Sequence, residues 1–408
     1  MPAPTTTGDR GFRLSLIVAV LAMLAPFSID TYLPSFPDIA RELNAADWQL
    51  QQTLSLYLLA FGAMTLVYGP LSDAFGRKRV VLASLVLYIA SSIGCALATN
   101  IQWLLVARIG QGLMASGAVV IGRAIVRDAF SGARAQKVMS QVMLLFAGGA
   151  VAAPILGGYL QDAYGWRSVF WFLTGLGVVL CLWTAAMLPE THTSGRQSAH
   201  PGKIAIAYWH SLKHVGFVLL VLSVSLNFGA MFLYVAGSPT LLYDHLGLRA
   251  DQFGYLFVPI VAGLMVGAFT SGRLAGRYTH EQAVVLGFVI MLVAGVANLA
   301  MSLWLMPRLW TVVGPVMLYT AGMSIAMPNL SLLGLECLPN RRGLAAAVQS
   351  FVQMIFMAVV AGALVPPLSR HLWLLAAGML GLTTLSLLLW FWYRRRPPAP
   401  IVHGGATA

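Results

Sequence analysis

Long apolar runs separated by short polar segments make up most of the chain. Each run is close to the ~20 residues that a helix needs to cross a bilayer and is far longer than a typical strand. Six runs precede the longest polar stretch and six follow it, at residues 14–36, 48–71, 80–98, 102–125, 137–161, 167–188, 214–237, 252–275, 282–304, 309–333, 343–366 and 371–393. The pattern predicts an all-α membrane protein with twelve transmembrane helices.

The longest polar stretch, Thr191 to Lys213, divides the chain into two halves. It contains Pro201 and Gly202, which are typical of loops. A Gly-x-Leu pattern closes the second run at Gly69 and recurs at Gly272 at the end of the eighth, which indicates two pseudo-symmetric bundles. We therefore predict an N-terminal six-helix half at 1–190, a cytoplasmic linker at 191–213, a C-terminal six-helix half at 214–393 and a disordered tail at 394–408.

Composition and charge support this interpretation. Of the 408 residues, 59% are hydrophobic and 9% are charged, and no soluble domain of this size can bury so much apolar surface. The net charge of +12 could suggest nucleic acid, but 19 of the 25 Lys and Arg residues lie on the predicted side that carries both termini. Such a bias marks the cytoplasmic side. We expect both termini in the cytoplasm, a multi-pass protein of the bacterial inner membrane, and no nucleic-acid partner.

One acidic residue, Asp30, lies inside an apolar run. The other twelve Asp and Glu residues fall in loops or at the ends of runs. An ionised carboxylate at the bilayer centre costs about 2.5–3.5 kcal/mol on insertion scales, and such residues commonly mark ion or proton pathways. Asp30 is therefore the candidate proton site.

Arg108 lies well inside the fourth run, about six residues from its predicted outer end, in the sequence Arg108-Ile-Gly-Gln111-Gly. It lies about as far from the predicted outer end of its helix as Asp30 does, so the two side chains are expected at a similar depth and paired. The alternative is that the Arg108 side chain reaches lipid headgroups or backbone carbonyls.

Two segments carry further candidate residues. The connection after the second run reads Gly69-Pro-Leu-Ser-Asp73-Ala-Phe-Gly76-Arg77-Lys-Arg79, in which Gly76 permits a tight turn and the basic residues anchor one membrane face. The fifth run holds small residues around a proline that permits a bend, namely Gly149, Pro154, Gly157 and Gly158. The alternatives are a basic turn that only follows the charge bias, and generic packing of small residues.

Together these features resemble the major facilitator superfamily, and more narrowly its bicyclomycin and chloramphenicol resistance (Bcr/CflA) branch of drug/proton antiporters. The resemblance covers residues 12–393 approximately and includes Asp30-Thr-Tyr-Leu-Pro34 and Gly237-Ser-Pro239. It implies that Asp30 and Arg108 take part in proton coupling. It also implies that the proline- and glycine-rich fifth helix is the motif that distinguishes exporters from importers.

The resemblance also assigns roles to the loop after the second helix. In the family, the Asp of this loop caps the start of the eleventh helix from the other half and latches the cytoplasmic side in the outward-open state. Here that places Asp73 near Gly343, at a helix N-terminus that carries partial positive charge. We also expect Arg77 to bridge to Asp128 at the end of the fourth helix.

Candidate residues for a substrate cavity are polar or aromatic side chains within the apolar runs. Aromatic walls with a few hydrogen-bonding groups suit amphiphilic drugs, although each residue can equally serve helix–helix packing. The candidates are Tyr32, Tyr57, Gln111, Asn227, Phe228, Tyr234, Asn298, Asn329, Gln349 and Gln353.

The expected function is proton-coupled export of amphiphilic, drug-like antibiotics by alternating access. Open alternatives are an exporter of a small metabolite such as a sugar or amino acid, a nutrient importer, and a membrane enzyme. The fifth-run motif argues against import, and the chain shows neither a His/Asp/Ser constellation nor a Gly-rich nucleotide loop, so we expect no enzyme activity. We expect no cofactor other than the proton as coupling ion, no metal site, and a monomer. His210 and His214 share a helix face, which we interpret as solvated rather than metal-binding.

Overall fold

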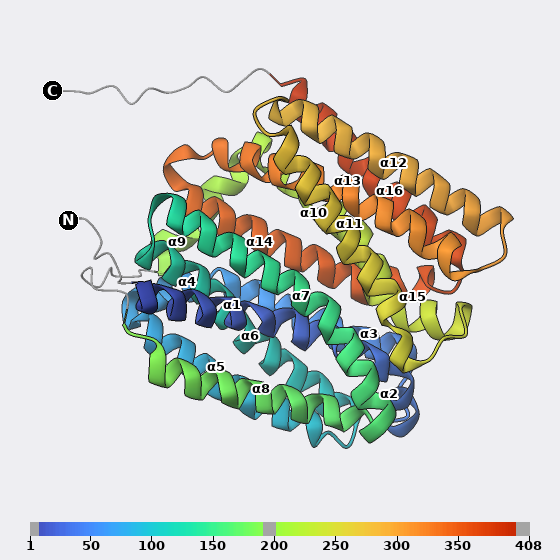
Figure 1. Cartoon of the computed structure of the whole chain (residues 1–408), viewed down its shortest axis with the longest axis horizontal. Helices are drawn as coiled ribbons and strands as arrows, with labels where there is room; N and C mark the ends of the chain where they lie inside the picture. The colour runs from blue at the N-terminus through green and yellow to red at the C-terminus, as the bar shows by residue number, and fades with distance from the viewer. Residues whose placement is uncertain (1–7, 191–200, 397–408) are drawn as a thin grey trace.

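The computed structural model describes residues 8–190 and 201–396, so residues 397–408 of the predicted tail lie outside the described residues. Within the described part the chain is helical, and its one β-type pairing is an isolated bridge between Ala275 and Tyr278. Figure 1 shows that α1 begins and α16 ends at the same side of the molecule. The predicted all-α class is confirmed.

The first half of the chain supplies eight helices and one short 3-10 turn. The first predicted run becomes α1, the turn η1 and α2, which together form one candidate membrane span from Leu14 to Glu42. The elements are α1 (Gly8–Asp30), η1 (Leu33–Ser35), α2 (Phe36–Glu42), α3 (Asp47–Thr65), α4 (Tyr68–Phe75), α5 (Arg77–Ala96), α6 (Ile101–Ala129), α7 (Gly132–Tyr164) and α8 (Trp166–Met187).

The second half repeats the series after α9 (Pro201–Lys213). The eleventh predicted run contains a π-helical segment, η5, just before Pro366 and Pro367, because prolines have no N–H to continue the helical hydrogen bonds. The elements are α10 (Val215–Ala236), η2 (Thr240–His245), η3 (Ala250–Gln252), α11 (Gly254–Leu274), α12 (His280–Trp304), α13 (Leu309–Glu336), η4 (Pro339–Arg341), α14 (Arg342–Val359), η5 (Val360–Leu364), α15 (Val365–Leu368) and α16 (Leu372–Arg394).

The second predicted run is a broken helix. Among the described residues, eleven helices are long and apolar enough to span a membrane, and the pair α3 and α4, bent by 49°, makes the twelfth. A break leaves carbonyl groups without an intrahelical donor. The carbonyl of Leu66, at the break, accepts a 3.0 Å hydrogen bond from the Tyr208 hydroxyl of α9.

The linker differs from its predicted loop character. Residues 191–200 lie outside the described part, but Pro201 and Gly202 begin a helix instead of a loop. Proline suits the first position of a helix, because its missing N–H would have no partner there and its φ angle is already helical.

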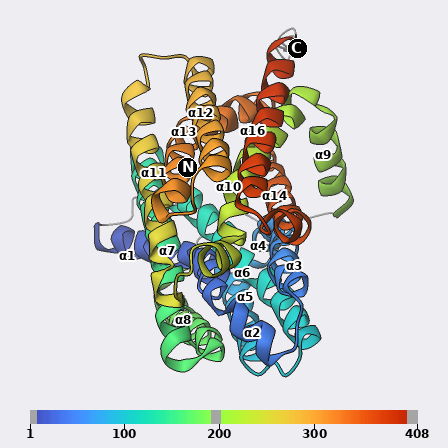
Figure 2. The same cartoon turned by 90° about the vertical axis from the view of Figure 1, so that its right-hand side faces the viewer.

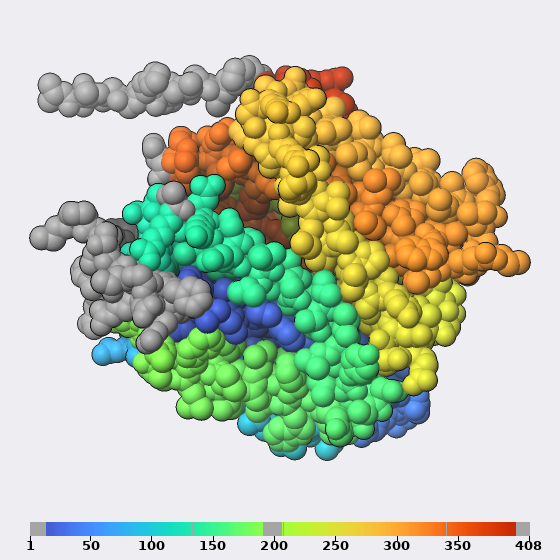
Figure 3. All heavy atoms as spheres, in the orientation of Figure 1, coloured from blue at the N-terminus to red at the C-terminus, as the bar shows by residue number. Residues whose placement is uncertain are grey.

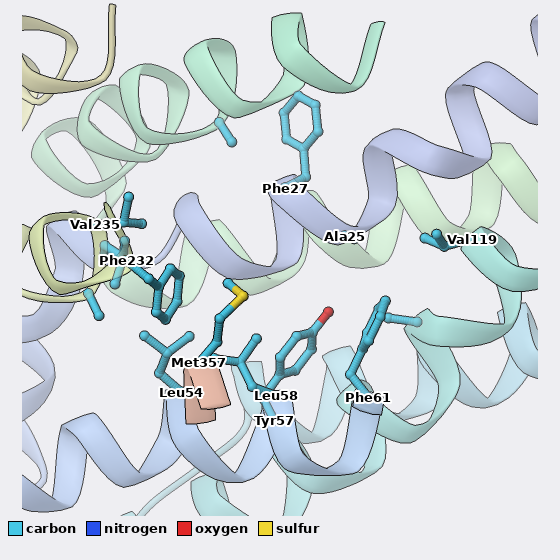
Figure 4. Packing of buried hydrophobic residues seen from close by; sticks show 14 of the residues in the cluster. Ala25, Phe27, Leu54, Tyr57, Leu58, Phe61, Val119, Phe232, Val235 and Met357 are labelled. Carbon is cyan, nitrogen blue, oxygen red and sulfur yellow. The ribbon is translucent and has the colours of Figure 1, made fainter. Parts of the chain in front are cut away.

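The helices gather into two groups that correspond to the predicted halves. In Figure 2, α1–α8 lie on one side of the molecule and α10–α16 on the other. Figure 4 shows the seam between the groups, where Leu54 and Leu58 of α3 lie beside Phe232 of α10 and Met357 of α14. We call the side with the Gly69–Arg79 loop the loop side, and the opposite side the far side.

Close packing within the first group depends on Gly112 of α6. A Cβ atom added there would overlap the backbone carbonyl of Tyr57 on α3. We therefore expect Gly112→Val to force the two helices apart and to lower the free energy of unfolding by about 1–3 kcal/mol. Thermal unfolding of the purified protein in detergent measures this effect.

Gly175 of α8 provides the matched control, because a Cβ added there meets no atom within 4 Å. Gly175→Val should leave the unfolding temperature close to that of the wild type. Equal shifts for the two variants would contradict the role of Gly112.

Candidate transport site

The Arg108 guanidinium lies at the centre of the first half. Its side chain is fully buried on α6, with the guanidinium carbon 4.2 Å from the ring centre of Tyr32 and 4.3 Å from that of Tyr57. Its Nη1 donates to the carbonyl of Ser28 at 3.0 Å and to the side-chain oxygen of Gln111. The buried charge is therefore stabilised by two aromatic faces and two oxygen dipoles.

Asp30 lies at the last residue of α1 and is 7% exposed. No ion pair joins it to Arg108 in this structure, and its buried Oδ1 has no hydrogen-bond partner. The direct pair expected from sequence is therefore absent from this conformation. The reason is the register of α1: the backbone carbonyl of Ser28 lies on the side of the helix that faces Arg108, and Asp30, two residues later, is rotated by about 200° around the helix.

The structure thus fits the alternative in which Arg108 bonds a backbone carbonyl. The Nε and Nη2 atoms of Arg108 and the Tyr57 hydroxyl are also buried without a hydrogen-bond partner. Buried polar groups are normally paired, and unpaired ones are expensive in hydrocarbon. The first half therefore holds an acid and a base with unused hydrogen-bonding capacity, which is a typical feature of a functional site.

The other predicted cavity residues of the first half serve helix packing. The Tyr32 hydroxyl is 2.9 Å from the Thr53 hydroxyl of α3, and Gln111 donates to Ser92 of α5 at 2.8 Å. Tyr32, Tyr57 and Gln111 are all fully buried. They surround Arg108 and do not face open space.

The second half contains a buried polar network without any charge. Asn227 donates to Ser386 at 2.8 Å, and Asn298 donates to the Tyr234 hydroxyl. All three predicted candidates, Asn227, Tyr234 and Asn298, are buried, while Phe228 is half-buried. These hydrogen bonds hold helices together, as the packing alternative for these residues anticipated.

Three more candidates lie toward the loop side and are half-buried. Asn329 bonds to His280 at 2.7 Å, and Gln349 donates to Ser331 at 2.8 Å. Gln353 is half-buried on α14, and its side chain is accessible for further contacts. Gln349 and Gln353 are one helical turn apart, so they lie on the same face of α14.

The loop after α4 confirms the predicted bridge between Arg77 and Asp128. Arg77 is buried and bonds Asp128 at 3.0 Å and Asp73 at 2.5 Å. Gly69 lies in α4, Gly76 takes a positive φ of 96°, and Arg79 is exposed.

The predicted latch between Asp73 and the start of α14 is not formed. The Asp73 carboxylate forms an ion pair with Arg77. At the start of α14, a Cβ added at Gly343 would lie 3.8 Å from a guanidinium nitrogen of Arg127 and within 4 Å of no atom of Asp73. The family assigns this latch to the outward-open state, whereas this structure is closed at the far side.

Hydrogen bonds between the two halves show which side is closed. Gln51 donates to the carbonyl of Ala236 at 3.0 Å, and Tyr243 donates to that of Pro34 at 2.6 Å. Both bonds lie toward the far side. In the space-filling view of Figure 3, by contrast, the surface is hollowed between the halves toward the loop side.

The fifth-helix motif contributes to the far-side closure through backbone contacts. A Cβ at Gly157 would overlap the carbonyl of Thr31 in the same half, and a Cβ at Gly158 would overlap the carbonyl of Ala250 in the other half. Gly149 packs against Pro26 of α1, and Pro154 is buried within α7. Gly158 is therefore a point at which the α7 backbone directly approaches the second half.

Glu190, at the end of the first half, is a functional candidate that the sequence analysis missed. Its carboxylate accepts hydrogen bonds from the backbone N–H groups of Arg77 at 2.9 Å and Lys78 at 3.3 Å, at the start of α5. A Cβ at Gly76 would meet this carboxylate at 2.6 Å. The available signal was a lone acid just after the sixth run, on the same predicted side as the basic loop.

Comparison with known proteins agrees with this architecture. The family model described as Major Facilitator Superfamily matches residues 18–361. The chain is 32% identical over 357 residues to the uncharacterized MFS-type transporter YdgK of Bacillus subtilis, covering 87% of this chain and 89% of that protein. It is 27% identical over 357 residues to a bicyclomycin resistance protein homolog of Haemophilus influenzae, covering 86% and 88%.

A solved structure has the same fold. The chain aligns with a bacterial homolog of the human lysosomal transporter Spinster, in an inward-facing and unoccupied conformation, with a TM-score of 0.73 at 15% identity, covering 97% of this chain and 100% of that one. Two helical halves that enclose charged groups and close at one side define a multi-pass membrane transporter. The chain belongs to the Major Facilitator Superfamily.

The aromatic clamp on Arg108 leads to a prediction. The Tyr57 hydroxyl has no hydrogen-bond partner, so Tyr57→Phe removes no bond and keeps the ring face. Tyr57→Leu removes the ring and should cost about 2 kcal/mol, the value for a desolvated cation–π contact. Thermal unfolding in detergent compares the two variants, and equal losses would show that the ring face does not stabilise Arg108.

Removing the Glu190 carboxylate should free the start of α5. Glu190→Ala removes a cap of two backbone N–H groups, which costs about 1 kcal/mol, and should speed hydrogen exchange at Arg77 and Lys78. Glu281→Ala is the matched control, because Glu281 forms a half-exposed ion pair with Arg394. Unchanged exchange at Arg77 in Glu190→Ala would contradict the capping role.

Proposed function

We propose that this protein exports amphiphilic antibiotics, such as bicyclomycin-like or chloramphenicol-like compounds, in exchange for protons. The observation that carries the proposal is the Asp30 carboxylate, which is nine-tenths buried in a transmembrane half with an unpartnered oxygen. The similarity to a bicyclomycin resistance protein homolog supports the substrate class. The protein resides in the bacterial inner membrane as a monomer with both termini in the cytoplasm.

Protonation of Asp30 is the coupling step of this proposal. The ionised carboxylate is costly in a low-dielectric environment, and uptake of a proton from outside removes that charge. Delivery of the proton to the cytoplasm then restores it. Each charge that moves inward supplies about 2.3 kcal/mol per 100 mV of membrane potential.

Arg108 links α6 to α1, the helix that carries Asp30. Its hydrogen bond to the Ser28 carbonyl ties α6 to the end of α1, two residues before Asp30. A change in the charge of Asp30 changes the electrostatic energy of the guanidinium, and therefore the strength with which α6 holds α1. In this way protonation alters packing within the first half.

The substrate lies between the halves in this proposal. The half-buried side chains of Gln349, Gln353 and Phe228 offer hydrogen bonds and an aromatic face to an amphiphile. Asp73, Arg77 and Asp128 form the loop-side gate, which closes when the far side opens. When the far side opens, the contact between Gly158 and Ala250 breaks.

Asp30→Asn tests the coupling, because the amide cannot take up and release a proton. In proteoliposomes with an imposed pH gradient, we expect the variant to lose gradient-driven transport of a chloramphenicol-like antibiotic, by at least about tenfold. Asp47→Asn is the control, since Asp47 is an exposed acid at the start of α3.

Full gradient-driven transport by Asp30→Asn would refute the assignment of Asp30. A different outcome is that the wild-type protein transports a sugar or an amino acid and no antibiotic of a panel. That result would refute the proposed substrate class and leave the assignment of Asp30 to proton coupling unaffected.

A further inference from the structure

An apolar crevice separates the two halves on the membrane-facing surface. Its volume is about 730 Å³, and it lies between one face of α7 and the middle of α11. Figure 3 shows the surface hollowed between these two helices. The lining residues are Leu144, Ala147, Gly148, Val151, Ala152, Ile155, Leu156 and Tyr159 of α7 with Val261 and Met265 of α11.

The position of the crevice places it at the level of the lipid hydrocarbon. The α7 residues run from the middle of a candidate span toward its far end, and Val261 and Met265 lie in the middle of another. Leu144 is 62% exposed and Met265 is 54% exposed. Since neither side chain is covered by protein, the surrounding bilayer is in contact with the crevice.

The chemistry of the lining selects an apolar occupant. Except for the Tyr159 hydroxyl, every lining side chain is aliphatic, a thioether or a glycine, and the backbone groups are engaged in helices. Apart from the Tyr159 hydroxyl, the lining side chains offer no donor or acceptor to the polar parts of a drug, whereas an alkyl chain needs none. The volume falls within the range of about 300–1,000 Å³ that is typical of small-molecule sites.

We propose that this crevice binds the acyl chain of a bilayer lipid. The halves touch at Gly158 and Ala250 and diverge toward Leu144, so the chain fills the wedge between α7 and α11. Closing the loop side brings these helices together and expels the chain. A lipid that binds one conformation alone stabilises that conformation.

Gly148 allows the crevice to be filled without disturbing the packing. A Cβ added there meets no atom within 4 Å, so Gly148→Leu places its side chain in the crevice. Gly381→Leu is the matched control on α16, because Gly381 is equally exposed and a Cβ there also meets nothing within 4 Å. Both substitutions add the same side chain to a lipid-facing helix.

The experiment uses the full-length protein in proteoliposomes that contain a phosphatidylcholine with a photoreactive diazirine in the acyl chain. After illumination, labelled peptides are mapped by mass spectrometry. We expect label to concentrate on residues 144–159 and 261–265, to fall by about tenfold at these sites in Gly148→Leu, which corresponds to about 1.4 kcal/mol, and to remain in Gly381→Leu. Met265→Ala enlarges the crevice and should retain or increase the label.

Label spread evenly over all lipid-facing helices, or unaffected by Gly148→Leu, would overturn the proposal. Displacement of the label by an added chloramphenicol-like antibiotic would also overturn it, because the crevice would then belong to the drug. The measurement requires only that α7 and α11 span the bilayer. The result of this labelling experiment is therefore independent of whether the protein couples to protons or exports drugs.

Discussion

A buried positive charge determines the organisation of the first half. Arg108 has no carboxylate bonded to it, so its environment must supply the stabilisation that an ion pair would otherwise give. Two tyrosine rings, a backbone carbonyl and a glutamine side chain do so from α1, α3 and α6. These contacts fix the register of three helices around one group, and they leave the nearby acid, Asp30, free to change its charge without breaking a salt bridge.

The two halves are held together differently from the helices within each half. Side-chain hydrogen bonds from Gln51 and Tyr243 reach backbone carbonyls across the seam, and Gly158 lets α7 approach Ala250. The one ion pair described between the halves, Arg249 with Asp162 at 3.4 Å, is exposed to solvent on both sides, and exposed pairs of this kind contribute little to stability. The interface is therefore held at one side by a few contacts, while hydrogen bonds such as that from Asn227 to Ser386 join helices within the second half.

Much of the fold could be predicted from sequence, because a bilayer imposes a length and a polarity on every span. The site was harder to predict. Depth alone placed Asp30 beside Arg108, but the rotation of α1 decides which group meets the guanidinium, and in this structure that group is the backbone carbonyl of Ser28. The aromatic clamp combines Tyr32, which follows α1, with Tyr57 of α3, so no local pattern indicates it. At Pro201 the sequence pattern is misleading. We expect a loop there because proline is typical of loops, but Pro201 begins α9.

The break between α3 and α4 has a mechanical consequence. The α3 portion of this span is bonded to the opposite half through Gln51, whereas α4 carries the acidic end of the Asp73–Arg77 pair. If α3 and α4 formed one unbroken helix, a tilt of one end would tilt the other end equally. The 49° joint instead lets the two ends turn independently, and the Tyr208 hydroxyl rests on the carbonyl at that joint. The helix α9, in the segment that links the halves, is thus bonded to the bend in this span.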